Sequence, residues 1–144
     1  MRISIEFHAD NELILPIHYN YILQGFLYKN LTDKDYLNFL HETGYQLANK
    51  NFKLFTYSRL LGKFRIMQSA GKIAFSSPFT LVVASGVEQF ITDLAETLIR
   101  SERVFLGDTP VEIKSISVHK KITLTDTVKI KMLSPIVAHK TVRH

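Results

Sequence analysis

Tyr28, His41 and Lys53 are the residues of this chain whose types and settings best suit chemistry. Histidine exchanges protons near neutral pH, because the reference pKa of its side chain is about 6.5. Tyrosine, with a reference pKa of about 10, is better suited to donate a proton or to position a group than to act as a base. Lysine supplies a positive point charge, which stabilises negative charge on nearby oxygen atoms. Side chains of these types can transfer protons and stabilise an anionic transition state.

Tyr28 and His41 also have ordinary structural interpretations. Tyr28 lies about 170° around a predicted helix from the centre of its apolar stripe, so it is either a surface residue or part of a site. His41 lies at the flank of a second predicted helix, where the macrodipole favours a histidine near the C-terminus. The residues alone leave both interpretations open.

Lys53 opens a predicted strand that also carries aromatic and basic side chains. Phe55, Tyr57 and Arg59 share its face, because side chains alternate along a strand. Cations interleaved with aromatic rings suit base stacking and phosphate contact in nucleic acids. Phe55 and Tyr57 are also explained as core residues, and the residues alone favour that interpretation.

Motifs for several common reactions are absent from the sequence. There is no glycine loop that cradles phosphate, no HExxH and no GxSxG. Acidic residues are scattered, so a two-metal nuclease centre is hard to assemble, and the six histidines are scattered as well. No cysteine is present, which excludes disulfides and thiolate metal sites. We therefore predict neither a metal site nor a cofactor.

The elements that must position these residues alternate between strands and helices. Strands are predicted where apolar residues alternate or where β-branched and aromatic residues gather, and helices where apolar residues recur on one face. A loop at 10–15 is expected before the first helix, which starts at or just after a proline, and a basic, turn-like link at 62–71 between two later strands. The expected order is strand 2–8, helix 17–31, helix 32–44, strand 52–60, strand 72–84, helix 85–99 and strand 111–118.

Several residues predict how these elements begin, end or bend. Thr32 and Ser85 resemble helix N-caps, each followed three residues later by an acidic residue, and Gly44 is typical just past a helix C-terminus. Pro78 predicts that its strand lies at an edge or contains a bulge. The apolar phase flips within 113–116, which also predicts a bulge.

The order of elements is the βαββαβ plan of a ferredoxin-like α+β fold, which RNA-recognition (RRM-like) domains share. We expect this domain to occupy residues 1–119. After it the alternation restarts, in a strand with nothing downstream to pack against. Residues 120–144 are therefore expected to form a linker and the opening strand of an incomplete second ferredoxin-like domain, with 128–138 as a candidate homodimer contact.

Basic residues gather near the C-terminus of a chain whose net charge is +5. Seven lysines and arginines follow position 113 against the single acidic residue Asp126, whereas the preceding part is nearly neutral. A basic segment beside a neutral body indicates either a polyanion partner such as nucleic acid or a solvated basic surface. The candidate RNA-binding residues are Arg59, Lys63, Arg65, Lys120, Lys121, Lys129 and Lys131.

Composition is typical of a globular domain, with 46% hydrophobic and 22% charged residues. No apolar run approaches the roughly 20 residues that span a bilayer, and the N-terminus does not resemble a signal peptide. We expect a cytoplasmic protein without a membrane partner.

Four segments resemble, in order, the CRISPR-associated repeat-processing endoribonucleases of the RAMP superfamily. LPIHYNYILQGFLY at 15–28 resembles the first-helix signature of that family, and FLHE at 39–42 resembles the segment that bears its catalytic histidine. KLFTYS at 53–58 resembles the strand that follows, and LSPI at 133–136 resembles the first strand of its second domain. Together the segments span nearly the whole chain.

This resemblance implies a ferredoxin-like endoribonuclease that processes CRISPR repeat RNA without a metal or cofactor. The family's catalytic residues carry over as Tyr28, His41 and Lys53. The implied reaction is attack of a ribose 2′-hydroxyl on the adjacent phosphate, which expels the 5′-oxygen and leaves a 2′,3′-cyclic phosphate. The alternative is a non-catalytic RAMP-type RNA-binding or assembly module, because family members carry a C-terminal glycine-rich loop and this chain has no glycine after Gly107.

Overall fold

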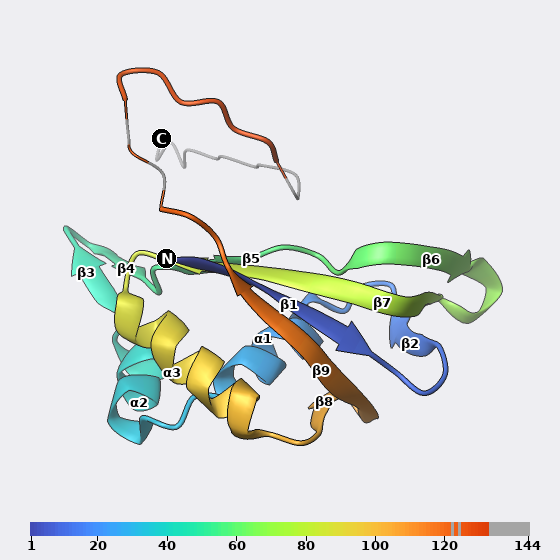
Figure 1. The fold of residues 1–144 in the computed structure, drawn as a ribbon. Helices are drawn as coiled ribbons and strands as arrows, with labels where there is room; N and C mark the ends of the chain where they lie inside the picture. The colour runs from blue at the N-terminus through green and yellow to red at the C-terminus, as the bar shows by residue number, and fades with distance from the viewer. Residues whose placement is uncertain (122, 124, 133–144) are drawn as a thin grey trace, which may run out of the picture.

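The computed structural model describes residues 1–121, 123 and 125–132, in which helices cover one face of an antiparallel sheet (Figure 1). The helices are α1 (Asn20–Lys29), α2 (Lys34–Glu42) and α3 (Glu88–Arg100), and a short 3₁₀ turn lies at Gln68–Ala70. The strands are β1 (Arg2–His8), β2 (Leu13–Pro16), β3 (Tyr45–Leu47), β4 (Lys50–Phe52), β5 (Phe55–Tyr57), β6 (Leu61–Met67), β7 (Lys72–Ser85), β8 (Val104–Leu106) and β9 (Thr109–Val118).

In the described part of the chain, seven strands form the main sheet in the order β2-β7-β1-β9-β8, with β5 and β6 also paired to β7. The long strand β7 therefore joins β1 on one side to β5 and β6 on the other. Helices α1 and α2 come between β1 and β5 along the chain, and α3 comes between β7 and β9. This arrangement confirms the predicted ferredoxin-like α+β fold.

The helix-facing side of the sheet forms the core. Ile3, Ile5 and Phe7 of β1 are fully buried, and the residues between them are half-buried, as a period of two predicts. Burial of each such side chain stabilises the fold by about 1.5–3 kcal/mol. The stripe of α3 packs against them through Phe90, Ile91, Leu94 and Leu98. Ile99 was expected in this stripe, but it lies past its edge and is 71% exposed.

Two strands occupy segments that were predicted as loops. In β2 the buried Leu13 and Leu15 alternate with exposed residues, and α1 begins only at Asn20, after this strand has ended. β6 occupies the predicted link at 62–71 and pairs with β7. Its charged and exposed residues resemble a turn in composition, but pairing with a long neighbouring strand outweighs that local preference.

The start of α2 differs by one residue from the prediction. Asp33 rather than Thr32 is the N-cap, and its carboxylate accepts a hydrogen bond from the backbone N–H of Tyr36 at 2.9 Å. The hydroxyl of Thr32 donates to Asp93 of α3 and so links two helices. α2 ends before Gly44, whose φ of +63° suits glycine.

The strand predicted at 52–60 is interrupted. β3 and β4 form a separate two-stranded hairpin, and β5 joins the main sheet. Leu54 has a φ of +53°, a left-handed conformation that ends the extended run between β4 and β5. Lys53 therefore lies in a short link rather than at the start of a strand, and Arg59 lies beyond β5.

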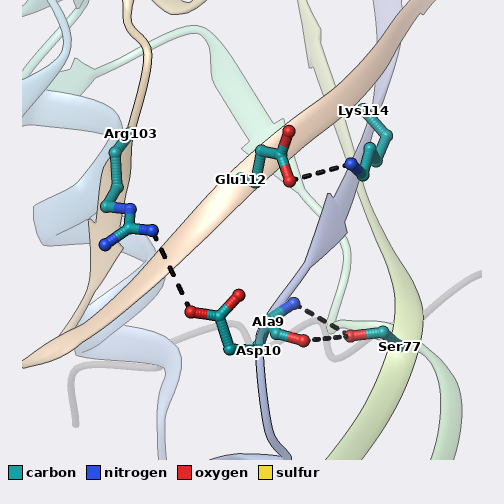
Figure 2. Close-up of polar contacts among 6 residues, drawn as sticks. All are labelled: Ala9, Asp10, Ser77, Arg103, Glu112 and Lys114. Atoms are coloured by element: carbon teal, nitrogen blue, oxygen red, sulfur yellow. Dashed lines mark hydrogen bonds and ion pairs between the residues drawn. The ribbon is translucent and has the colours of Figure 1, made fainter.

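The bulge predicted at 113–116 is confirmed in β9. The register of the β1–β9 ladder shifts between Glu6 and Phe7, which leaves Lys114 without a partner in that ladder. The ammonium of Lys114 donates to the carboxylate of Glu112 at 2.8 Å (Figure 2).

Polar contacts fasten the loop after β1 to the neighbouring strands (Figure 2). The backbone N–H of Ala9 donates to the hydroxyl of Ser77 at 2.9 Å, and that hydroxyl donates to the carbonyl of Ala9 at 3.2 Å. Arg103 and Asp10 form an ion pair at 3.9 Å. Beside Ser77, the β6–β7 register shifts opposite Pro78, so this proline marks a bulge in a strand that has neighbours on both sides.

The segment after β9 does not contain the predicted strand in its described part. Residues 128–132 are not in a strand, and Val128, Ile130 and Met132 are exposed. Apolar alternation specifies a strand only where a neighbouring strand supplies hydrogen bonds. The rest of the predicted strand at 128–138 and the LSPI segment lie outside the described residues, and the division at 119/120 stays a prediction.

Among the described residues, no helix is long and apolar enough to cross a membrane.

Candidate active site

Tyr28 lies near the C-terminus of α1 and is 8% exposed. Its ring meets the ring of Phe55 edge to face, with centroids 5.9 Å apart. The sequence placed Tyr28 opposite the apolar stripe of its helix, but α2 and β5 cover that side as well. A tyrosine buried in this way needs a polar partner for its hydroxyl.

His41 lies in the last turn of α2 and is exposed. Its ring lies against that of Tyr28, with centroids 4.5 Å apart and an interplanar angle of 35°. The imidazole is therefore held on one side by the phenol ring and remains accessible to a ligand. The structure places His41 neither in the interior nor on a different face from Tyr28.

Lys53 supplies the polar partner that Tyr28 requires. Its ammonium donates a hydrogen bond to the phenol oxygen of Tyr28 at 2.9 Å and lies 5.2 Å from the centroid of the same ring. Because Lys53 and His41 both contact Tyr28, three segments that are distant in sequence converge. We refer to Tyr28, His41 and Lys53 as the Tyr28 cluster.

Ser85 holds the backbone that carries Lys53. Its hydroxyl donates to the carbonyl of Leu54 at 2.8 Å and accepts from the backbone N–H of Val87 at 2.9 Å. The ammonium of Met1 donates to the carbonyl of Ser85 at 2.7 Å. A residue that is 7% exposed thus joins the end of β7, the start of α3 and the link beside Lys53. The sequence predicted Ser85 as the N-cap of this helix, but the N-cap of α3 is Val87, two residues later. No sequence signal indicated the bond of Ser85 to Leu54.

Two neighbouring tyrosines have structural roles. Burial raises the pKa of Tyr57, and the nearby Tyr28 adds to this effect. The hydroxyl of Tyr57 donates to the carbonyl of Asn20 at 3.2 Å. Burial, together with the hydrogen bond from Tyr45, also raises the pKa of Tyr36. Both tyrosines therefore keep their protons at neutral pH and are poor candidates for a base.

Arg59 and Arg65, two of the predicted RNA-binding residues, are engaged within the chain. The guanidinium of Arg59 donates to the phenol oxygen of Tyr19 at 3.3 Å and to the carbonyl of Ile17 at 3.0 Å. Arg65 forms a two-point contact with Glu12, with distances of 3.1 and 2.6 Å. This contact lowers the pKa of Glu12, chiefly through the hydrogen bond from Arg65. RNA binding by these arginines would have to compete with those contacts.

The predicted lysines fall into separate groups. Lys120 and Lys121 line a pocket of about 770 Å³ together with Lys53. Lys63 is exposed on β6, and Lys129 and Lys131 are exposed in the segment after β9. The structure therefore brings two of the predicted RNA-binding lysines to the neighbourhood of the Tyr28 cluster.

The described residues contain no group of three His, Asp or Glu side chains that could hold a metal ion. The ion pairs found in this part of the structure do not involve His41 or Lys53. The Tyr28 cluster thus offers an accessible imidazole, a phenol and a cation at one place. Such a set can transfer protons and stabilise negative charge on a phosphate.

A family model described as CRISPR-associated protein Cas6, N-terminal, matches residues 14–117. The chain is 26% identical over 133 residues to a curated relative, the CRISPR-associated endoribonuclease Cas6 1 of Methanocaldococcus jannaschii. This alignment covers 89% of the chain and 50% of the relative. The chain thus spans about half the length of this relative.

Solved structures show the same fold. The chain is similar to a structure described as a characterization of a Cas6-related gene from Pyrococcus furiosus, with a TM-score of 0.69 and 21% identity over 88% of this chain and 50% of that one. It is also similar to a structure described as an RAMP protein binding different RNA substrates, with a TM-score of 0.66 and 23% identity over 87% of this chain and 50% of that one. At these identities the likeness establishes the fold.

Proposed function

The chain belongs to the family of the CRISPR-associated protein Cas6, of which it matches the N-terminal part, and on this basis we propose that it cleaves CRISPR repeat RNA in the cytoplasm without a metal ion. The proposed substrate agrees with the name of the curated relative, which is an endoribonuclease. It also agrees with the structural neighbour that is described as binding different RNA substrates.

The observation that supports this activity is the contact of Tyr28 with both His41 and Lys53. The rings of Tyr28 and His41 are 4.5 Å apart, and the ammonium of Lys53 is 2.9 Å from the phenol oxygen. A phosphodiester placed against this cluster would meet a cation and two groups able to transfer protons. These are the requirements of RNA cleavage by an internal nucleophile.

In the proposed reaction the ribose 2′-oxygen forms a bond to phosphorus and the bond from phosphorus to the 5′-oxygen breaks. We assign removal of the 2′-hydroxyl proton to the imidazole of His41 and delivery of a proton to the leaving 5′-oxygen to the phenol of Tyr28. Lys53 stabilises the negative charge that develops on the phosphate oxygens and on the phenol oxygen. The products are a 2′,3′-cyclic phosphate and a 5′-hydroxyl.

The test is incubation of the whole chain with its cognate CRISPR repeat RNA, labelled at the 5′ end, in the presence of EDTA. We expect one cut that leaves a 2′,3′-cyclic phosphate. A 2′-deoxy substitution before the scissile phosphate should abolish the cut, because it removes the nucleophile. Cleavage of the deoxy substrate, or loss of cleavage in EDTA, would contradict the mechanism. Binding without any cleavage would identify the chain as an RNA-holding RAMP module instead.

The candidate homodimer through 128–138 is a separate proposal. Gel filtration at high protein concentration tests it, and a monomer throughout the concentration range would count against it.

A further inference from the structure

A pocket opens beside Lys53 at the end of the sheet where β7 runs into α3. Its volume is about 770 Å³, within the range of roughly 300–1,000 Å³ that small-molecule sites occupy. Segments that are distant in sequence form its wall: the start of β1, the residues from the end of β4 to β5, the end of β7 with the start of α3, and the end of β9 with the residues after it. We call it the basic pocket, and it is lined by Met1, Arg2, Phe52, Lys53, Leu54, Phe55, Thr56, Ala84, Ser85, Gly86, Glu88, Val118, His119, Lys120 and Lys121.

The wall of the basic pocket combines apolar surface with cations. Exposed apolar side chains include Leu54, at 46%, and Val118, at 65%. Arg2, Lys53, Lys120 and Lys121 add positive charge, against the single carboxylate of Glu88. Large apolar side chains exposed around a hollow in this way are typical of a ligand site.

An unstacked nucleotide has the chemistry that fits this wall. Its base presents a flat apolar face and its phosphate carries a negative charge. Proteins that bind single-stranded RNA place bases on apolar and aromatic side chains and phosphates beside lysine and arginine. We propose that the basic pocket binds one unstacked nucleotide of single-stranded RNA, next to the phosphate that the Tyr28 cluster acts on.

Lys53 connects the pocket with the cluster. It belongs to the wall of the pocket, while its ammonium donates to the phenol oxygen of Tyr28 at 2.9 Å. A nucleotide in the pocket therefore lies within one side-chain length of the reacting groups. The position next to the scissile phosphate rests on the proposed function, whereas nucleotide binding itself does not.

Gly86 allows the pocket to be filled without disturbing the backbone. A Cβ atom built at Gly86 meets nothing within 4 Å, and its φ is not in the left-handed region. Gly86→Leu should therefore place a branched side chain in the pocket of a folded protein. Ser69→Leu adds an exposed leucine in the 3₁₀ turn, outside the pocket, and serves as the matched control.

The experiment compares two RNA probes that cannot be cut by a 2′-hydroxyl. One is 2′-O-methyl hexauridylate with a fluorescent label, and the other is the same backbone without bases. Removal of the bases should weaken binding to the wild-type chain and to Ser69→Leu by about 10-fold, as base stacking on apolar side chains predicts. In Gly86→Leu the two probes should bind within a factor of about two, because a base can no longer enter.

If removal of the bases weakened binding equally in all three proteins, or did not weaken binding to the wild type, the proposal would be overturned. Backbone amide shifts in NMR spectra give a second measurement. Compared with the probe that lacks bases, the probe with bases should shift the amide signals of Thr56 and Gly86 but not that of Ser69. If it shifted only the signals of residues outside the pocket, the proposal would also be overturned. Binding of these probes does not require catalysis, so the result can be interpreted even if the chain does not cleave repeat RNA.

Discussion

The ammonium of Lys53 lies 2.9 Å from the phenol oxygen of Tyr28, although 25 residues separate them in sequence. This contact joins the link after β4 to helix α1, and the ring of His41 lies on the same tyrosine. The phenol is thus the central member of the cluster, and changes to it should affect both of its neighbours.

Tyr28→Phe should separate the chemistry of the phenol from its packing. Phenylalanine keeps the ring contacts with His41 and Phe55 but removes the oxygen that Lys53 contacts. We expect cleavage of repeat RNA to slow by about 10²–10³-fold, with RNA affinity nearly unchanged. Single-turnover rates and fluorescence anisotropy measure the two effects. A wild-type rate would exclude Tyr28 from the reaction.

His41→Ala should slow cleavage by about 10²–10⁴-fold, the usual contribution of one acid–base group. The side chain is exposed, so the free energy of unfolding should change little. His18→Ala changes another exposed histidine and should cleave at the wild-type rate. If the two variants had equal rates, the assignment of His41 would be wrong.

Ser85→Ala tests a positioning residue. Loss of the hydroxyl leaves the carbonyl of Leu54 and the N–H of Val87 without their partner, which should reduce the free energy of unfolding by about 1–3 kcal/mol. Because Lys53 is then held less firmly, the cleavage rate at saturating RNA should fall by up to about 100-fold while RNA affinity stays constant.

Ser85→Thr keeps a hydroxyl at this position and should recover most of the cleavage rate. Urea unfolding of both variants measures the change in the free energy of unfolding, which can then be compared with the change in cleavage rate. A variant that loses stability but keeps the wild-type rate would show that Ser85 has only a structural role.

Replacement of both Lys120 and Lys121 by alanine should reduce the salt dependence of RNA binding. Each lysine that contacts a phosphate contributes about 0.7 to the slope of log affinity against log salt for single strands, so the slope should fall by about 1.4. The double replacement of Lys34 and Lys72 removes the same charge from exposed positions outside the pocket. An equal fall in both double variants would indicate a general effect of net charge.

Arg65→Ala should raise the pKa of Glu12 toward its usual value of 4.5, because the hydrogen bond from Arg65 is the main cause of its lowering. A carboxyl group whose pKa is lowered by folding stabilises the protein above its unfolded pKa and loses that effect as the pH falls through its folded pKa. The wild type should therefore lose slightly more stability than Arg65→Ala below pH 4.5. NMR titration of the Glu12 carboxyl tests the shift, with Lys63→Ala as the control.

The elements with strong periodicity could be predicted from the sequence. The alternation in β1 and the stripe of α3 each have one buried face, so the sequence alone identifies them. β6 could not be identified in this way, because its residues are largely exposed and pairing with β7 determines its conformation. The segment after β9 shows the opposite case: it alternates well, but its described residues have no strand neighbour.

The residues of the candidate site could be predicted from the sequence, but the contacts that hold them in place could not. Tyr28, His41 and Lys53 were named from a family resemblance, whereas their convergence depends on contacts between elements. His41 of α2 lies against Tyr28 of α1, and the β3–β4 hairpin, which packs on α2 through Tyr45, leads the chain back to Lys53. Burial of Tyr28 depends on Phe55, a contact between elements that no local pattern reveals. Arg59 was expected to face RNA, but its partners, Tyr19 and a backbone carbonyl, belong to a segment that precedes α1.

The β3–β4 hairpin lies between His41 and Lys53, and Tyr45 at its start pairs with Phe52 at its end. An antiparallel hairpin returns the chain to its point of departure, so residues inserted or deleted in pairs at its tip leave both ends in place. Sequence spacing between the imidazole and the ammonium can therefore vary among related chains without any change in their separation in space. An alignment that allows no insertion or deletion between the histidine and the lysine would therefore pair the lysine with the wrong residue.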